Sequence, residues 1–459
     1  MGLFFGKKAT ALKKRYSRLN PTQIIPLVFL GIILLGTVLL VLPVASRNGE
    51  SCGILGALFT ATSATCVTGL VLFDTWSQFS GFGQGVILGL IEIGGLGFMS
   101  AASIVVFLLR RKVGLKQRML MAQALSLNEM EGVVRLQKYV LFGSLGVQLL
   151  GAVVLYLRFL PTWGAVTSLW WGVFHAVSAF CNAGFDILGS IQPGASIMAF
   201  NNDPVVCITL MVLIVVGGLG FFVWEEIMRL RRWRKLSVYT KLVLTTSFAL
   251  ILGGAAAFCL LEWNNPGTMG AMSPGQKILN GFFQSVTVRT AGFASMNQGL
   301  LTDAGKGVSI FLMLIGGSSG STAGGVKTVT LVVLLLFLLA RSRGRQTVSV
   351  FKHSIPTDKV LDAVTIVSVL VALGMFGALF ISATSPIGFT DSLYESISAL
   401  ATVGLTAGAT GSLCFSAKLL IIVYMYFGRV GVLTISLGFL MGDKAEERFR
   451  YAYTNVLIG

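Results

Sequence analysis

Four short segments of this chain carry a glycine behind a run of small or hydroxylated residues, and they offer the best place for chemistry. Their sequences are SATCVTGLV (Ser63–Val71), SAFCNAGFD (Ser178–Asp186), SVTVRTAGF (Ser285–Phe293) and SALATVGLT (Ser398–Thr406). A Ser precedes the Gly by six residues in three segments and by one residue more in the third, so the Gly is the better anchor for alignment. Close helix packing alone does not explain four glycines at matching places.

Backbone oxygen is the chemistry that these segments can supply. A short helix that enters a membrane from outside points its C-terminal carbonyls at the membrane centre, where they favour a cation. A following Gly permits the dihedral angles that turn successive carbonyls toward an axis. Four such loops give rings of oxygens that can replace the hydration shell of K+. We therefore expect a K+ selectivity filter, with K+ held by backbone carbonyls, at Val67, Thr68, Gly69, Asn182, Ala183, Gly184, Thr290, Ala291, Gly292, Thr402, Val403 and Gly404.

The composition indicates how such loops are carried. Hydrophobic residues make up 54% of the 459-residue chain and charged residues only 12%, so a bilayer must solvate much of the surface. The content of 55 Gly and 10 Pro suits closely packed membrane helices. The run from Ile24 to Leu42 is too long for the core of a cleavable signal. Six cysteines without metal-ligand spacing and two distant histidines favour neither a metal centre nor a cofactor in this chain.

The net charge of +17 is distributed in a pattern typical of membrane topology. Basic clusters at 7–18, 110–138, 229–241 and 341–359 alternate with stretches of mixed or acidic charge. This arrangement predicts a multi-pass protein of the cell membrane with both termini in the cytoplasm. It favours membrane lipid or an acidic protein as the partner of the basic faces, and not nucleic acid.

Hydropathy predicts four membrane–pore–membrane repeats. Each repeat has two apolar runs of about 20 residues or more, the length that crosses a bilayer, around a segment too short to cross. The short segments lie at about 54–65, 168–180, 277–288 and 390–401. We expect an all-α membrane protein with eight transmembrane helices and four re-entrant pore helices around a single central pore. The expected units are an N-terminus at 1–20, repeats at 21–112, 136–235, 239–345 and 358–442, and a C-terminal tail at 443–459.

The second apolar run of the third repeat is interrupted by a segment that is poor in helix formers. Five Gly and four hydroxylated residues occupy the ten positions from 316 to 325, which should break the helix. Irregular backbone is acceptable at membrane depth only inside protein or along a water-filled path. We expect a gate there, formed by Gly316, Gly317, Ser318, Gly320, Gly324 and Gly325 together with Arg429.

Two charges inside apolar runs also need an account. Two roles fit Arg429: its side chain donates hydrogen bonds to carbonyls of the 316–325 segment, or its charge is a barrier that K+ must pass. Pairing with a buried acid is the structural alternative. For Glu92, pairing with a cation and protonation both remain open. The milder glycine-containing segments Gly94–Gly97, Gly217–Gly220 and Gly428–Gly431 are best explained by close helix packing.

These motifs together resemble the Trk/Ktr/HKT superfamily of K+ transporters over nearly the whole chain. CVTGL, CNAGF, RTAGF and TVGL carry the resemblance with EIGGLGF (Glu92–Phe98), GGSSGSTAGGVKT (Gly316–Thr328) and FGRVG (Phe427–Gly431). A chain that begins almost directly with the first repeat looks most like the KtrB-type membrane subunit. The resemblance implies K+ uptake through one pore per subunit, Na+ as activator or coupling ion, a homodimer, and a cytoplasmic ring of KtrA-like nucleotide-binding subunits. Glu92 departs from the family, in which Gln is commoner.

Two other classes of protein were weighed against this one. A secondary cation transporter, a Na+/K+ or H+/K+ symporter with a broken-helix substrate site, also uses interrupted helices near the midplane. Four similar parallel repeats favour a pore instead. An intramembrane enzyme lacks support, because the chain has no HExxH and no paired intramembrane aspartates. Gly316–Gly320 matches GxSxG only by its letters, so we expect no enzymatic activity.

Overall fold

The computed structural model describes residues 21–97 and 133–431. The predicted N-terminal segment at 1–20, the end of the first repeat and the tail at 443–459 lie outside the described residues. Within the described ranges the chain is helical, apart from 3-10 turns, loops and one antiparallel hairpin of β1 (Val348–Val350) and β2 (His353–Ile355). The all-helical class agrees with the expectation from the sequence.

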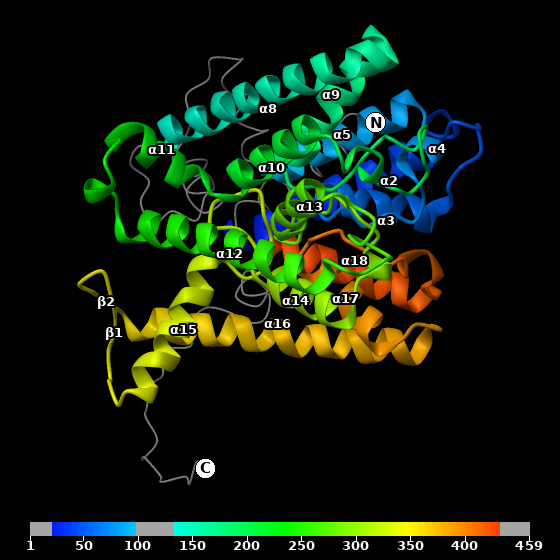
Figure 1. The fold of residues 1–459 in the computed structure, drawn as a ribbon. Helices are drawn as coiled ribbons and strands as arrows, with labels where there is room; N and C mark the ends of the chain where they lie inside the picture. Colours follow the sequence, from blue (N-terminus) through cyan, green and yellow to red (C-terminus); the bar gives the residue numbers. More distant parts are fainter. Residues whose placement is uncertain (1–20, 98–132, 432–459) are drawn as a thin grey trace, which may run out of the picture.

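Four long helices form the outer wall of the molecule. They are α2 (Pro21–Val41), α8 (Val133–Trp163), α12 (Val238–Glu262) and α16 (Thr357–Thr384). Each contains an apolar stretch long enough to cross a membrane, and no more than 39% of each stretch is buried, so apolar side chains such as Leu34, Leu149 and Leu379 face outward. In Figure 1, α8, α12 and α16 run across the view in roughly the same direction.

Four shorter helices follow these long ones and pack against them. They are α3 (Gly53–Thr65), α9 (Ala165–Phe180), α13 (Pro274–Thr287) and α17 (Phe389–Leu400), which pack on α2, α8, α12 and α16 respectively. With 12 to 16 residues, none reaches the length that crosses a bilayer. The C-terminal half of each is buried, so all four end inside the protein.

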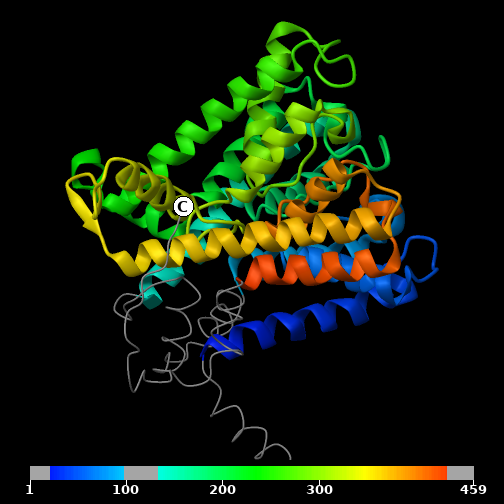
Figure 2. The ribbon, with the colours of Figure 1, turned by 90° about the horizontal axis from the view of Figure 1, so that it is seen from below.

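A third set of helices joins one short helix to the next. It contains α5 (Gly81–Leu96), α10 (Pro204–Gly218) with α11 (Phe221–Leu230), α14 (Asp303–Leu314) with α15 (Thr328–Ser342), and α18 (Phe415–Val430). Helix α5 packs on α9, α10 on α13, α14 on α17, and α18 on α3, so the contacts return to the first short helix and close a ring. Figure 2 shows α18 alongside α2 and α16, where the ring closes.

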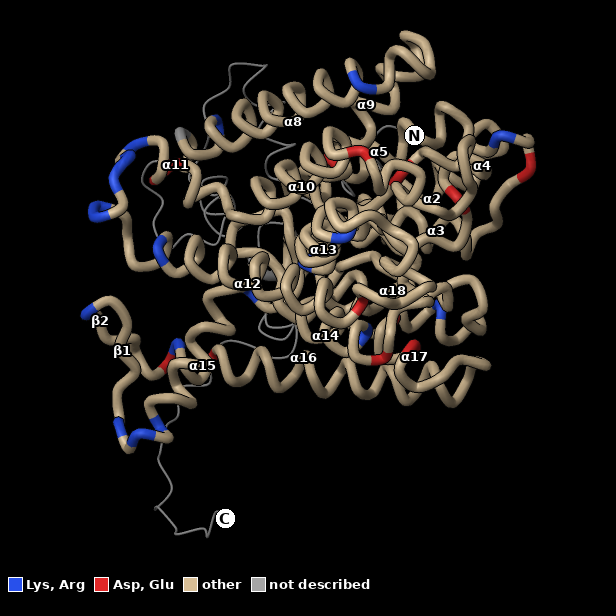
Figure 3. Tube along the Cα trace, viewed as in Figure 1, with Lys and Arg blue, Asp and Glu red and all other residues tan. Residues whose placement is uncertain are grey.

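Short elements connect these helices. They are α4 (Thr75–Gln78), η1 (Pro43–Ala45), η2 (Met198–Phe200), η3 (Trp233–Lys235), η4 (Gln298–Leu300) and η5 (Thr410–Ser412). Lys and Arg gather at the end of the molecule that carries α11 and the β1–β2 hairpin, whereas Asp and Glu lie mainly toward the opposite end, around α3, α4 and α17 (Figure 3).

The helix breaks differ in part from the expectation. Close packing was expected at Gly217–Gly220, and a β-carbon added to Gly217 would lie 2.0 Å from the carbonyl oxygen of Phe180; the bend of 94° between α10 and α11 at the same place was not expected. The bend forms because Gly220 adopts φ 92 and the amide of Phe221 leaves the helix pattern to donate to the carbonyl of Gly320 at 3.0 Å. Four described helices are long and apolar enough to span a membrane, or five with this bent pair, so eight spans stay a prediction.

Two other glycines are packed as closely as Gly217. A β-carbon added to Gly94 would lie 2.0 Å from the carbonyl oxygen of Thr65, and one added to Gly428 would lie 2.2 Å from that of Leu400. Only glycine allows these helices to approach the ends of α3 and α17 so closely.

Candidate cation pathway

The four short helices end in loops with the same unusual backbone. The residue two places before each predicted glycine has a positive φ: 56° at Val67, 58° at Asn182, 66° at Thr290 and 52° at Thr402. The four glycines also have positive φ, from 70° to 94°. Side chains rarely adopt this region, and for a β-branched residue it is strained. Such strain persists only where the surroundings impose it, which is common at functional sites.

Hydrogen bonds to the short helices impose this backbone. The amide of Thr68 donates to the Ser63 carbonyl at 2.8 Å, and the amide of Val403 donates to the Ser398 carbonyl at 2.7 Å. The Ser63 and Ser398 hydroxyls accept from the amides of the following glycines at 3.0 and 3.1 Å. Ser178 is placed in the same way, and its hydroxyl donates to the Phe185 carbonyl at 2.7 Å. The N–H groups therefore face their own helix, and the carbonyls are left for the other side.

The third loop is one residue shorter than its counterparts. Thr287, and not Ser285, takes the bracing position: its hydroxyl donates to the Phe293 carbonyl at 2.7 Å. Ser285 instead donates to the Ile251 carbonyl in α12 at 2.8 Å. Ser285 is therefore not the counterpart of the other three serines, in agreement with the choice of Gly292 as the anchor for alignment.

The four glycines meet around one axis. A β-carbon added to Gly69, Gly184, Gly292 or Gly404 would lie 2.5, 2.9, 2.7 or 2.0 Å from a carbonyl oxygen of the next loop. Those oxygens belong in turn to Ala183, Ala291, Val403 and Thr68, so the contacts run once around the ring and return to the first loop. No hydrogen bond engages these four carbonyls within the described residues. All twelve predicted loop residues thus lie in one buried cluster that can present oxygens to a cation.

A vestibule opens on one side of the glycines. Its empty volume is about 1150 Å³, and its lining includes all four glycines with Asp74 and Asp186. Asp186, in the loop between α9 and η2, is partly exposed to it. Burial, together with the nearby negative charge of Asp74, raises the pKa of Asp186 to about 7. The approach to the glycines therefore carries acidic side chains, one of which titrates near neutral pH.

The predicted gate segment lies on the other side of the glycines, against the ends of two short helices. The amide of Ser318 donates to the Gly218 carbonyl at 3.0 Å, and the hydroxyl of Thr322 donates to the Phe180 carbonyl at 3.2 Å. A β-carbon added to Gly324 would lie 2.0 Å from the hydroxyl oxygen of Thr402. The segment from 315 to 327 therefore crosses beneath loops two and four, between α14 and α15.

Arg429 connects this segment to the first repeat. Its guanidinium donates to the carbonyls of Thr322 and Gly94, and to that of Gly95 at 3.0 Å. These contacts are those of the first role considered for it, whereas the barrier role stays a prediction. No carboxylate pairs with Arg429 among the ion pairs of residues 21–97 and 133–431.

Glu92 is held by uncharged groups. One oxygen accepts from the Gln148 amide at 3.0 Å and from the Cys181 thiol at 3.3 Å, and the other has no partner in the described part of the chain. Glu92 therefore contacts the residue that precedes loop two, and it forms no ion pair with a described side chain.

Two charged residues next to the loops were missed by the sequence analysis. Arg289 precedes loop three, is half-buried, and its guanidinium donates to the Gly316 carbonyl at 3.5 Å. Glu395 lies inside α17, fully buried behind loop four. The available signal for both was a charge next to a filter motif, but Glu395 was counted only with the acidic stretches of the topology and Arg289 only as part of the RTAGF motif.

Comparisons with known proteins agree with this geometry. Residues 8–448 match the TrkH family model, described as cation transport protein. The chain is 40% identical to the potassium/sodium uptake protein NtpJ of Enterococcus hirae, over 98% of this chain and 100% of that protein. It is 39% identical to the Ktr system potassium uptake protein B of Bacillus subtilis, over 95% and 96%.

A solved structure has the same fold. The crystal structure of the potassium transporter TrkH from Vibrio parahaemolyticus superposes with a TM-score of 0.68 at 18% identity, over 89% of this chain and 84% of that one. These matches span nearly the full length of the chain, and the cation transporters among them agree with the expectation that the chain is not an enzyme. The chain belongs to the TrkH family of cation transport proteins and resembles its Ktr-type members.

Proposed function

We propose that this chain is the K+-selective, ion-translocating subunit of a K+ uptake system. The observation that carries the proposal is the closed ring of four glycines, each in left-handed backbone and each against a carbonyl of the next loop. Carbonyls held in such rings can replace the water around K+. The relatives from Enterococcus hirae and Bacillus subtilis are both named for potassium uptake, which supports the choice of ion.

The orientation follows from the charges. The vestibule with Asp74 and Asp186 faces outside, and the basic end with α11 and the hairpin faces the cytoplasm. Ions then enter from the acidic side, pass the glycines, and meet the 315–327 segment and Arg429. This segment is the gate, because it is irregular backbone buried beneath the filter. The protein lies in the cell membrane with both termini in the cytoplasm.

The partners follow from the family. The Bacillus subtilis relative is named as protein B of a Ktr system, which supports a second component for this chain too. We propose a homodimer on a cytoplasmic ring of KtrA-like nucleotide-binding subunits, whose nucleotide state opens the gate. Na+ acts as activator or coupling ion. The name of the Enterococcus hirae relative includes sodium and keeps the alternative of a Na+/K+ symporter in view.

Purified protein in liposomes tests the proposal. We expect uptake of K+ and of its tracer Rb+ to exceed uptake of Na+ and Li+ at least about tenfold, because the rings fit the larger ion. Equal fluxes of Na+ and K+ would contradict a K+ filter. An inward Na+ gradient at zero membrane potential separates the two candidates, because a symporter then accumulates Rb+ against its own gradient and a gated pore does not.

A further inference from the structure

Equivalent positions of the four short helices carry a buried polar side chain. Counted three residues before the bracing hydroxyl of each loop, these positions hold Thr60, His175, Gln284 and Glu395, all between 0% and 2% exposed. A buried polar group must find partners in the protein. Their partners therefore show what each position holds in place.

In three repeats this side chain holds the segment that follows the filter glycine. The His175 Nδ1 lies 2.7 Å from the Trp171 carbonyl, which leaves Nε2 to accept from the Ile187 amide at 3.4 Å. Gln284 and Gln298 exchange two hydrogen bonds, at 2.6 and 3.1 Å. In the first repeat, by contrast, the Thr60 hydroxyl donates within its own helix.

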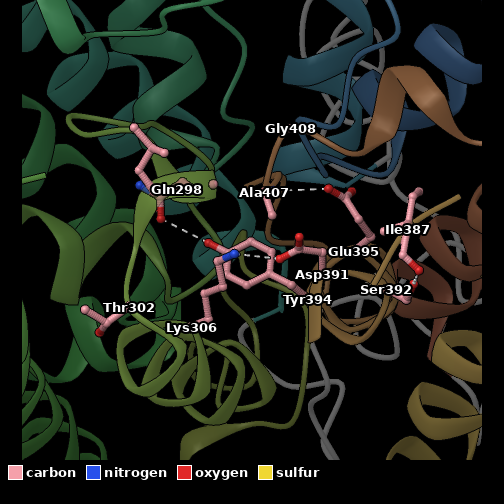
Figure 4. Close-up of polar contacts among 12 residues, drawn as sticks. Gln298, Thr302, Lys306, Ile387, Asp391, Ser392, Tyr394, Glu395, Ala407 and Gly408 are labelled. Carbon is pink, nitrogen blue, oxygen red and sulfur yellow. Dashed lines mark hydrogen bonds and ion pairs between the residues drawn. The ribbon is translucent and has the colours of Figure 1, made fainter. Parts of the chain in front are cut away.

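Glu395 makes more hydrogen bonds to the segment beyond the filter glycine than the other three side chains, and it is the single carboxylate of the four. It accepts from the amide of Ala407 at 3.1 Å and from the hydroxyl of Thr410 at 2.8 Å, as well as from the hydroxyl of Thr406. Figure 4 shows the Glu395 side chain directed at the loop segment that carries Ala407 and Gly408. No described Lys, Arg or His forms an ion pair with it, so donors from the post-filter segment alone satisfy this carboxylate.

The neighbouring residue ties loop four to loop three. The Tyr394 hydroxyl donates to Gln298 at 3.0 Å, and Gln298 also bonds to Gln284 in α13 (Figure 4). Helix α17 therefore holds both ends of loop four. Ser398 fixes the filter glycine from within, and Glu395 fixes the chain two to six residues farther on.

We propose that Glu395 is a positioning residue for K+ selectivity, which fixes residues 405–410 and through them the carbonyls of loop four. The inference rests on the proposed function, because it needs a filter to position. Glu395 touches no ion: its carboxylate reaches the backbone just beyond Gly404. Without this carboxylate, three hydrogen-bond donors at the outer end of loop four lose their acceptor. The ring of carbonyls then becomes looser and discriminates less well between K+ and the smaller Na+.

Variants in liposomes test this role through the ratio of Rb+ to Na+ flux. We expect Glu395→Ala to lower the ratio about tenfold, the order that corresponds to losing a buried hydrogen-bonding group. Glu395→Gln keeps the shape and most of the bonds, so its ratio should fall less. Thr410→Val removes one donor while Glu395 stays, and should shift the ratio in the same direction.

Asp391→Asn is the matched control. It removes a carboxylate from the same helix, one turn away, whose partner is Lys306 at 2.7 Å and not the post-filter segment (Figure 4). This variant should lower the melting temperature without changing the ratio. If Glu395→Gln and Thr410→Val keep the wild-type ratio while the melting temperature falls, Glu395 is only structural and the inference is overturned. A wild-type protein without K+ preference would overturn the proposed function instead.

Discussion

The layer of the four filter glycines, called the upper layer, differs in construction from the layer beneath it. This lower layer contains residues 315–327, Arg429 and the bend between α10 and α11. In the upper layer, all four loops share the same pair of left-handed residues, and each contacts the next. In the lower layer, α10 bends by 94° into α11, α14 and α15 are separated by 13 residues without α-helix, and Arg429 reaches across from α18. A ring that recognises a spherical ion needs matching contributions from all sides, whereas a gate needs one part that can move. This difference supports the proposal that the upper layer selects the ion and the lower layer is the gate.

Gly404→Ala tests the upper layer at its tightest point. The added carbon would lie 2.0 Å from the Thr68 carbonyl oxygen in backbone with φ 90. Strain and overlap each cost about 1–3 kcal/mol, so we expect Rb+ uptake to fall about 100-fold or more. Gly411→Ala, in η5 beside the same vestibule, is the control, because nothing lies within 4 Å of its added carbon. Equal uptake by the two variants would contradict the ring.

Deletion of residues 319–321 tests the lower layer. The middle of the loop is held by several hydrogen bonds, including Phe221 amide to Gly320 carbonyl and Tyr239 hydroxyl to Ser319 carbonyl at 3.1 Å. At about 1 kcal/mol each, the loss of these two bonds should raise Rb+ flux about 30-fold in liposomes. The Rb+ to Na+ ratio should stay constant, because the upper layer is untouched.

Arg429→Lys is a milder change in the same layer as that deletion. It keeps the charge but cannot reach the carbonyls of Thr322 and α5 together, so flux should rise by less than with the deletion. Unchanged flux in both variants would remove the gate from the lower layer. A changed ratio would mean that the two layers are not separable.

Gly69→Ser asks whether the four loops of the upper layer are interchangeable. Its added carbon would lie 2.5 Å from the Ala183 carbonyl oxygen, which is less tight than at Gly404. Overfilling at the lower end of its usual cost, about 1 kcal/mol, corresponds to an about fivefold fall in the Rb+ to Na+ ratio. Paired fluxes in one preparation measure it. An unchanged ratio would mean that loop one does not line the filter.

The sequence predicted the upper layer better than the lower. The glycine positions and the short helices could be read from spacing, because each loop repeats the same local pattern. The role of Thr287 in the third loop was not predicted, since the sequence does not show which of two nearby hydroxyls, Ser285 or Thr287, bonds to the loop. The bend at Gly217–Gly220 was missed because two glycines inside an apolar run look alike in a packed helix and in a broken one.

Long-range contacts account for the rest of what could not be predicted. The break in α10 depends on Gly320, about a hundred residues later in the chain, and Glu395 depends on a loop that lies beyond the filter. Neither the charge of Glu395 nor its neighbours indicate that its partners are two hydroxyls and an amide. The hairpin of β1 and β2 was also not foreseen.

The smallest predicted effect concerns the acidic approach to the upper layer. Because the pKa of Asp186 is raised to about 7, its carboxyl is mostly charged at pH 8 and mostly neutral at pH 6. A negative charge in the vestibule concentrates cations, so the half-saturating Rb+ concentration should be lower at pH 8 than at pH 6, by about threefold. Asp186→Asn should remove this difference and resemble the wild type at pH 6. Asp303→Asn, at an exposed position at the start of α14, should keep it.

The same groups allow a sharper version of this test. The negative charge of Asp74 is one cause of the raised pKa of Asp186, so Asp74→Asn should lower that pKa and move the pH dependence toward acid. The Rb+ to Na+ ratio should be independent of pH in every variant, because the vestibule supplies ions and the rings of carbonyls choose between them. If the Rb+ to Na+ ratio changes with pH together with the half-saturating concentration, Asp186 contributes to selectivity. The boundary between the part that concentrates ions and the part that selects them would then lie below the glycines.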